Sequence, residues 1–146
     1  MKRKAPKKES LAVEHHLGAA GKLVTFPKKS TIFTQGDSGD SIFYLKEGVV
    51  KLSLTNKTGK EAVIALLAAG DILGEGCISN GSSTRIATAT VMAPTIALQI
   101  KKGEMIRVLH EQKEFADRFI SYMLKRNVRI EADLVDQRAA SSEQSH

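Results

Sequence analysis

The sequence predicts a mainly β fold followed by C-terminal helices, an α+β arrangement. From Lys22 to about Gln99, short apolar runs alternate with turn signals, which is typical of an all-β roll or sandwich. From Glu104 to Gln137 there is neither proline nor glycine, and the apolar residues recur mostly at helical spacing. The length of 146 residues suits one domain rather than two.

The expected organisation has four parts and no helix-turn-helix domain. They are a basic, flexible tail at 1–20, with a short helix around Leu11–Leu17, a β-roll at 21–103, a helical segment at 104–137 and a disordered tail at 138–146. Five of the 22 basic residues stand in the first eight positions, which leaves 17 basic against 16 acidic residues elsewhere. A folded surface that grips DNA should carry clustered basic charge. We therefore expect no specific DNA binding by the chain as given.

Within the β segment, turn residues separate the expected strands. Ser41–Leu54 is interpreted as two strands broken at Gly48. Asn56–Gly59 is a hairpin turn, because asparagine and glycine accept the conformations that such turns need. The following strands are predicted at Glu61–Leu67, Arg85–Val91 and Thr95–Ile100, with Pro94 between the last two.

Two helices are expected after the strands, a short one to about His110 and a longer one from about Lys113. The longer helix carries apolar residues on more than one side, so it must bury one face on its own roll and another on a partner. We expect a homodimer whose seam contains Phe119, Met123 and Ile130. For Phe119 and Met123, packing against the chain's own roll is an equally good interpretation.

Composition excludes several classes of protein. The lone cysteine, Cys77, rules out an internal disulfide framework and a multi-cysteine iron–sulfur site, and it fits a cytoplasmic location. No apolar run approaches the roughly 20 residues of a membrane-spanning helix. The basic N-terminus is not followed by the apolar stretch of a secretory signal. Neither a membrane partner nor secretion is expected.

Two segments carry a family resemblance. Residues 31–50 contain a strand, the turn Gln35-Gly36-Asp37, Asp40 before an apolar strand, and then Gly48. This segment resembles the signature of cyclic-nucleotide-binding domains. The second segment is similar to that family's phosphate-binding cassette and reads Gly70-Asp71-Ile72-Leu73-Gly74-Glu75, with Arg85 and Ala87 matching further on.

The helix ending Lys125-Arg126-Asn127-Val128-Arg129 is similar to the dimer helix of Crp–Fnr transcription regulators. The resemblance covers about Leu23 to Gln137. It implies a double-stranded β-helix, or jelly roll, followed by a long dimerisation helix. It also implies the effector-sensing domain of such a regulator, with a small-molecule effector such as cyclic AMP or cyclic GMP and no other cofactor.

The chemistry of the cassette suits a cyclic phosphodiester. Backbone N–H groups at a glycine-flanked turn attract an anion, and a guanidinium can fork onto two phosphate oxygens. By resemblance, Arg85 holds the phosphate and Glu75 accepts the ribose 2′-hydroxyl proton. Further contacts are implied at Gly74, Gly76, Cys77 and Ile86. The alternative for Arg85 is a buried structural ion pair with Glu75, and the alternative for Cys77 is a small packed hydrophobe.

The sequence departs from the cyclic-AMP-binding pattern at two places. Ile86 stands where the family usually has a small residue, often serine, that touches the phosphate. Alignment on Met123 puts Ile130 and Glu131 where dimer-helix hydroxyls reach the base, with Asn127 as another candidate base contact. An apolar pocket discriminates weakly among purines, so the ligand's identity stays open. Ser82, Ser83 or Thr84 is a further source of a hydroxyl.

Two other functions compete with effector sensing. A metal-dependent cupin enzyme needs clustered imidazole and carboxylate ligands, but none of His15, His16, His110 and His146 falls in a predicted strand. No enzyme activity and no metal are expected. The remaining alternative is a stand-alone dimeric interaction module with a vestigial pocket, which the side chains of Ile86, Ile130 and Glu131 favour.

Overall fold

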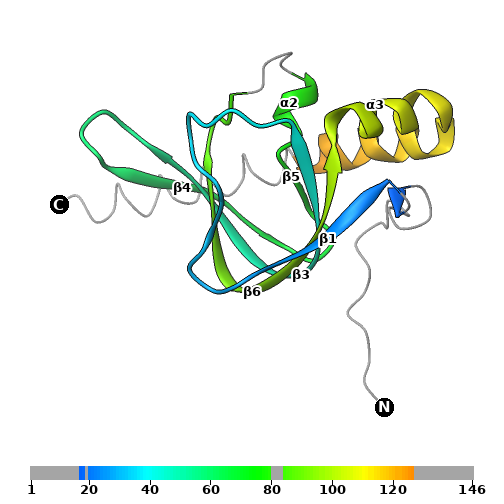
Figure 1. The fold of residues 1–146 in the computed structure, drawn as a ribbon. Helices are drawn as coiled ribbons and strands as arrows, with labels where there is room; N and C mark the ends of the chain where they lie inside the picture. Colours follow the sequence, from blue (N-terminus) through cyan, green and yellow to red (C-terminus); the bar gives the residue numbers. More distant parts are fainter. Residues whose placement is uncertain (1–16, 19, 80–83, 127–146) are drawn as a thin grey trace.

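The computed structural model describes residues 17–18, 20–79 and 84–126. Its strands form one six-stranded antiparallel sheet, ordered β1-β6-β3-β4, with β2 added on β6 and β5 on β3. They are β1 (Gly21–Phe26), β2 (Thr31–Phe33), β3 (Ser41–Thr55), β4 (Glu61–Ala68), β5 (Ile72–Leu73) and β6 (Thr88–Lys101). Figure 1 shows the sheet curled into a roll with the helices at one end. The predicted mainly β jelly roll with C-terminal helices is confirmed.

Two predicted strand breaks are wrong, because β3 runs through Gly48 and β6 runs through Pro94. The β3–β6 ladder shifts register on both sides of Glu47 instead of ending there. Gly48 has a φ of +114° and lies directly against Thr95. Pro94 hardly disturbs the pairing of β6, because it lies between the part of β6 that pairs with β1, from Thr95 onward, and the part that pairs with β2, at Ala89 and Thr90. Pro94 has no register partner in the three ladders that β6 forms, so its missing N–H removes no residue pair from them.

The final strand also begins later than predicted, at Thr88 rather than Arg85. The backbone of Arg85 is bonded instead to the turn at residues 34–37. Its N–H donates to the carbonyl of Asp37, and its own carbonyl accepts from the N–H of Gly36, each at 2.7 Å. These two bonds anchor the segment that carries the Arg85 side chain.

The hairpin turn at Asn56–Gly59 is confirmed. The side-chain oxygen of Asn56 accepts hydrogen bonds from the backbone N–H groups of Thr58 and Lys60, each at 2.9 Å. Gly59 supplies the positive φ of +85° that the turn requires. This turn joins β3 to β4 in a register that starts with Thr55 opposite Glu61.

Most of the buried apolar side chains form two clusters. One fills the roll and contains Phe43, Leu45, Val50, Leu52, Ala65, Leu67, Leu73, Ala89 and Ala97. The other lies between the roll and the helices and contains Leu17, Ile42, Ile72, Cys77, Leu98, Ile100, Met105, Val108 and Phe115. Leu17, from the segment expected to be a flexible tail, is only 1% exposed. The other residues of the Leu11–Leu17 helix lie outside the described residues.

The two helices predicted after the strands are α3 (Lys102–Glu111) and a helix over residues 113–126. A four-residue helix that was not predicted, α2 (Gly76–Ser79), lies between β5 and β6. Extended backbone at Gln112 separates α3 from the 113–126 helix. The predicted pair of C-terminal helices is thereby confirmed as far as residue 126. The expectations for 127–137 and for the tail at 138–146 lie outside the described residues.

Candidate functional site

A cavity of about 180 Å³ lies between α2, the strands of the roll and the end of the 113–126 helix. All six cassette residues singled out from the sequence line it: Gly74, Glu75, Gly76, Cys77, Arg85 and Ile86. The other lining residues are Phe33, Leu52, Ile64, Thr84, Ala87 and Arg126. The cavity therefore combines an apolar wall with two arginines and one carboxylate.

Arg85 is buried, with 7% of its surface exposed. Its Nη2 donates to the carbonyl of Ser41 at 2.8 Å and its Nη1 to that of Gly74 at 3.3 Å. The guanidinium carbon lies 4.4 Å from the centre of the Phe33 ring. Its Nε has no hydrogen-bond partner among the described residues. Burial lowers the pKa of this guanidinium, and the fields of Cys77 and nearby carboxylates oppose that shift.

Two glycines allow this placement of Arg85. A Cβ on Gly39 would lie 2.8 Å from Nε, and one on Gly74 would lie 2.8 Å from Nη1. Gly74 also has a φ of +84°, which side chains with a Cβ rarely adopt. The sequence supports close approach at Gly74, whereas the role of Gly39 in packing against Arg85 emerges only from the fold.

The expected alternative of an Arg85–Glu75 ion pair is not the arrangement found among the described residues. Arg85 donates to two backbone carbonyls, while Glu75 Oε1 lies 3.4 Å from Nη1 of Arg126. Arg126 is 4% exposed and also donates to the carbonyl of Ile72. Sequence reasoning missed Arg126 as a cavity residue. The available signal was its spacing, four residues beyond Tyr122 on the face that also presents Phe115 and Phe119.

Cys77 is packed in the apolar cluster between the roll and the helices. This agrees with the alternative interpretation of Cys77 as a small packed hydrophobe. Burial raises the pKa of its thiol, and the fields of Arg85 and Lys102 only partly oppose this. A raised pKa leaves little thiolate, which is the reactive form of cysteine. Cys77 is therefore a packed core residue that also lines the cavity.

Ile86 is 64% exposed at the rim of the cavity. Its hydrocarbon side chain cannot donate a hydrogen bond to a group in the cavity. Thr84 also lines the cavity, whereas the alternatives Ser82 and Ser83 lie outside the described residues. The candidate base contacts Asn127, Ile130 and Glu131 lie outside them as well, and so does Ile130 as a seam residue.

The two seam candidates that can be placed differ in their surroundings. Phe119 packs against the chain's own cluster, and its ring stacks on Phe115 with centroids 6.3 Å apart. Met123 is half-buried. The most exposed apolar side chains of this helix are instead Ile120 and Leu124, at 57% and 63%. The seam assignment of Phe119 and Met123 stays a prediction.

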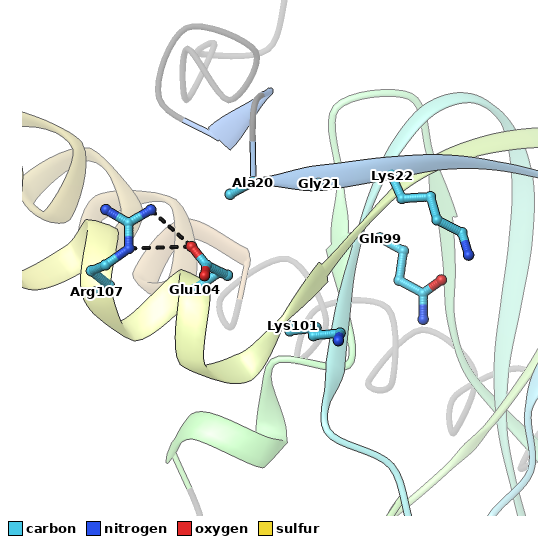
Figure 2. A pocket seen from close by; sticks show the side chains of 7 residues that line it. All are labelled: Ala20, Gly21, Lys22, Gln99, Lys101, Glu104 and Arg107. Atoms are coloured by element: carbon cyan, nitrogen blue, oxygen red, sulfur yellow. Dashed lines mark hydrogen bonds and ion pairs between the residues drawn. The ribbon is translucent and has the colours of Figure 1, made fainter.

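A second hollow, of about 490 Å³, lies where β1, β6 and α3 meet (Figure 2). Its lining includes Lys22, Lys101 and Arg107, but Figure 2 shows Arg107 turned toward Glu104, with which it makes an ion pair of 2.8 Å. Arg107 also pairs with Glu111 at 2.9 Å. These cations are exposed and do not converge on one point, so we assign no ligand here.

The described residues contain no group of three or more histidine, cysteine, aspartate or glutamate side chains arranged to hold a metal ion. His110 is exposed on α3, and the other histidines lie outside these residues. No helix within the same residues is long and apolar enough to cross a membrane.

Comparison with known proteins places this geometry in context. The sequence model of the cyclic nucleotide-binding domain matches residues 23–112. A CRP-like cAMP-activated global transcriptional regulator of Mycobacterium tuberculosis is 23% identical over 113 residues, covering 77% of this chain and 50% of the relative. The global nitrogen regulator of a Nostoc species is 30% identical over 93 residues, covering 63% and 42%. The chain spans about half the length of the curated relatives it matches.

Solved structures agree on the fold. The Thermus thermophilus catabolite activator protein superposes with a TM-score of 0.70 at 25% identity, over 85% of this chain and 58% of that one. The c-di-GMP responsive global regulator CLP of Xanthomonas campestris superposes with a TM-score of 0.78 at 16% identity, over 88% and 62%. The cassette cavity therefore lies in a roll whose fold these solved proteins share.

Proposed function

The chain belongs to the cyclic nucleotide-binding domain family, and we propose from this premise that its cavity binds the cyclic phosphate of a nucleotide. The chain would then act as the effector-sensing unit of a Crp–Fnr type transcription regulator. The curated relatives named above are regulators of about twice the matched length. We propose that this chain forms part of a regulator of the same kind.

The observation that carries this proposal is the buried Arg85 with an Nε that has no partner among the described residues. Removing a charged donor from water without a partner is unfavourable. A cyclic phosphodiester entering the cavity would supply an oxygen to this donor and a charge to the guanidinium. The backbone of Gly74 and Gly76 can approach the same anion closely, because neither residue carries a Cβ.

The rest of the nucleotide would meet the remaining walls. We propose that Glu75 accepts a hydrogen bond from the ribose 2′-hydroxyl, because Glu75 lines the cavity and its carboxylate forms an ion pair with Arg126. The base would lie against the apolar wall of Leu52, Ile64 and Ala87. Such a wall discriminates weakly among purines, so we expect cyclic AMP and cyclic GMP to bind with similar affinity.

The 113–126 helix would pass the binding event to a partner subunit. It contacts the cavity through Arg126 and presents Ile120 and Leu124 to solvent. We propose that a second copy of the chain covers this exposed face in a homodimer. A ligand can shift the helix pair only as far as its affinities for the two arrangements differ.

Thermal melting with cyclic AMP, cyclic GMP, cyclic di-nucleotides and linear nucleotides tests the proposal, beside an Arg85→Ala variant. At 100 times its dissociation constant, a ligand should add about 2.7 kcal/mol of stability, or several degrees in Tm. Arg85→Ala should abolish the shift. The matched control is Arg107→Ala, an arginine in exposed ion pairs away from the cavity, which should keep it.

Two outcomes would contradict the proposal. A shift that survives Arg85→Ala but vanishes in Arg107→Ala would place the ligand in the second hollow. No shift with any nucleotide would favour the alternative of a dimeric interaction module with a vestigial pocket. The observation that favours this alternative is the exposed Ile86 at the rim, which offers no side-chain donor.

A further inference from the structure

The helix at 113–126 turns one row of side chains toward the roll. Phe115 is fully buried, Phe119 stacks on it, and Tyr122 packs against the same apolar cluster. Arg126 follows four residues later and is 4% exposed. The row is thus apolar at its start and ends in two polar groups, which must find partners in the roll.

The hydroxyl of Tyr122 is bonded on both sides. It donates to Oδ1 of Asp71 at 3.2 Å and accepts from the N–H of Ile72 at 2.8 Å. Asp71 is itself 1% exposed, and its Oδ2 accepts from the N–H of Ala68 at 2.9 Å. One hydroxyl therefore joins the helix to the turn between β4 and β5.

Arg126 holds the same short segment one helical turn later. It donates to the carbonyl of Ile72 and lies 3.4 Å from Glu75 Oε1. Both backbone groups of Ile72 are consequently bonded to this helix, the N–H through Tyr122 and the carbonyl through Arg126. Because β5 is only two residues long and pairs with β3 at only two positions, these bonds to the helix add to that short ladder in fixing the path into Gly74 and Glu75.

We propose that Tyr122 is a positioning residue of the ligand site. It does not line the cavity. It sets the helix against Asp71 and Ile72, and this placement puts Arg126 beside Glu75 at the cavity wall. The inference rests on the proposed function, in which Glu75 accepts the ribose 2′-hydroxyl. Loss of the Tyr122 hydroxyl should therefore weaken recognition of the ribose 2′-hydroxyl more than it weakens binding of the phosphate.

The experiment compares the dissociation constants of cyclic AMP and 2′-deoxy cyclic AMP by titration calorimetry in the wild type and in Tyr122→Phe, which keeps the ring. The wild type should prefer cyclic AMP by about tenfold or more, the range of a hydrogen bond to a charged group. Tyr122→Phe should lose most of this preference, while its affinity for the deoxy nucleotide stays within about twofold, because the phosphate contacts are unchanged.

A matched control separates positioning from general destabilisation. Thr95 is also 1% exposed, and its hydroxyl donates to the carbonyl of Ala93 at 2.8 Å, away from the cavity. Thr95→Val should lower Tm and keep the preference. The positioning role alone is overturned if Tyr122→Phe lowers the affinity for both nucleotides equally. It is also overturned if the variant keeps the wild-type preference for cyclic AMP over 2′-deoxy cyclic AMP. Binding of neither nucleotide by the wild type overturns the proposed function, and a wild type that binds both equally overturns the role of Glu75.

Discussion

Nη1 of Arg126 lies 3.4 Å from Oε1 of Glu75, which joins the last described turn of the helix to the segment that leads into α2. The same guanidinium donates to the carbonyl of Ile72. A cation of the helix thereby serves both as a structural clamp and as part of the cavity wall. Changes to the helix and changes to the cavity should affect each other through this contact.

Replacing Arg126 with leucine should destabilise the ligand-free protein by about 1–3 kcal/mol, because the carbonyl of Ile72 loses its donor and Glu75 its partner. Urea denaturation measures this change. The control is Arg118→Leu on the same helix. Arg118 pairs with Glu114 at the surface, so its loss should change stability by less than about 0.5 kcal/mol. Equal effects of the two variants would contradict a clamp at Arg126.

Replacing Gly39 with alanine should weaken binding of cyclic AMP by about tenfold or more and leave the fold intact. The new Cβ would fall 2.8 Å from Nε of Arg85, which forces the guanidinium to move. Gly103→Ala is the control, because nothing lies within 4 Å of its Cβ position on α3, and it should stabilise by up to about 1 kcal/mol. Unchanged affinity in Gly39→Ala would show that the position of Arg85 does not govern binding.

Replacing Gly48 with alanine should destabilise the roll by about 3 kcal/mol or more, from backbone strain and overpacking together. Its φ is +114°, and a Cβ there would lie 2.1 Å from Oγ1 of Thr95 and 2.6 Å from its Cα. Gly59→Ala, with a φ of +85° but open space around its Cβ, should cost only about 1–2 kcal/mol. Thermal melts that rank the two variants the other way would contradict the packing described for Thr95.

The stability difference between the wild type and Tyr122→Phe should shrink as the pH rises above 10. Burial raises the pKa of Tyr122 above its ordinary value of 10.0, with Asp71 adding to the shift and Arg126 opposing it. Above pH 10 the unfolded chain loses this proton while the folded chain keeps it, so the wild type loses up to about 1.4 kcal/mol per pH unit. Urea titrations from pH 8 to 11 test this, and a difference independent of pH would contradict it.

Replacing Leu124 with glutamate should weaken self-association by at least about tenfold, because a partner would have to bury an unpaired charge. Sedimentation velocity over a concentration series measures the effect. Leu66→Glu on β4 is the control, since Leu66 is similarly exposed, at 61% against 63%, but lies on the roll. A wild type that stays monomeric, or a Leu124→Glu protein that pairs normally, would contradict the proposed seam.

The parts of this protein that depend on neighbours along the chain can be predicted from its sequence. The alternating apolar runs, the turn at Asn56–Gly59 and the helical spacing after Gly103 predict the roll and both helices, because each depends on local conformational preference. The family resemblance also identifies the cassette residues from Gly74 to Cys77 and Arg85, and the fold gathers them around one cavity. Their roles in binding remain proposals.

The contacts between side chains that are distant in the chain depend on the fold and cannot be predicted from local sequence. The sequence allowed Arg85 to pair with Glu75, but the fold gives Arg85 two backbone carbonyls and gives Glu75 to Arg126. Helical spacing places Arg126 on the buried face of its helix, but it does not identify Ile72 and Glu75, 54 and 51 residues away, as its partners. Spacing likewise does not show that Arg85 donates to Ser41, 44 residues away. Likewise Gly48 and Pro94 read as strand breaks locally, yet the paired strands β3 and β6 run through them, because interstrand hydrogen bonds and packing outweigh the local preference of a single residue.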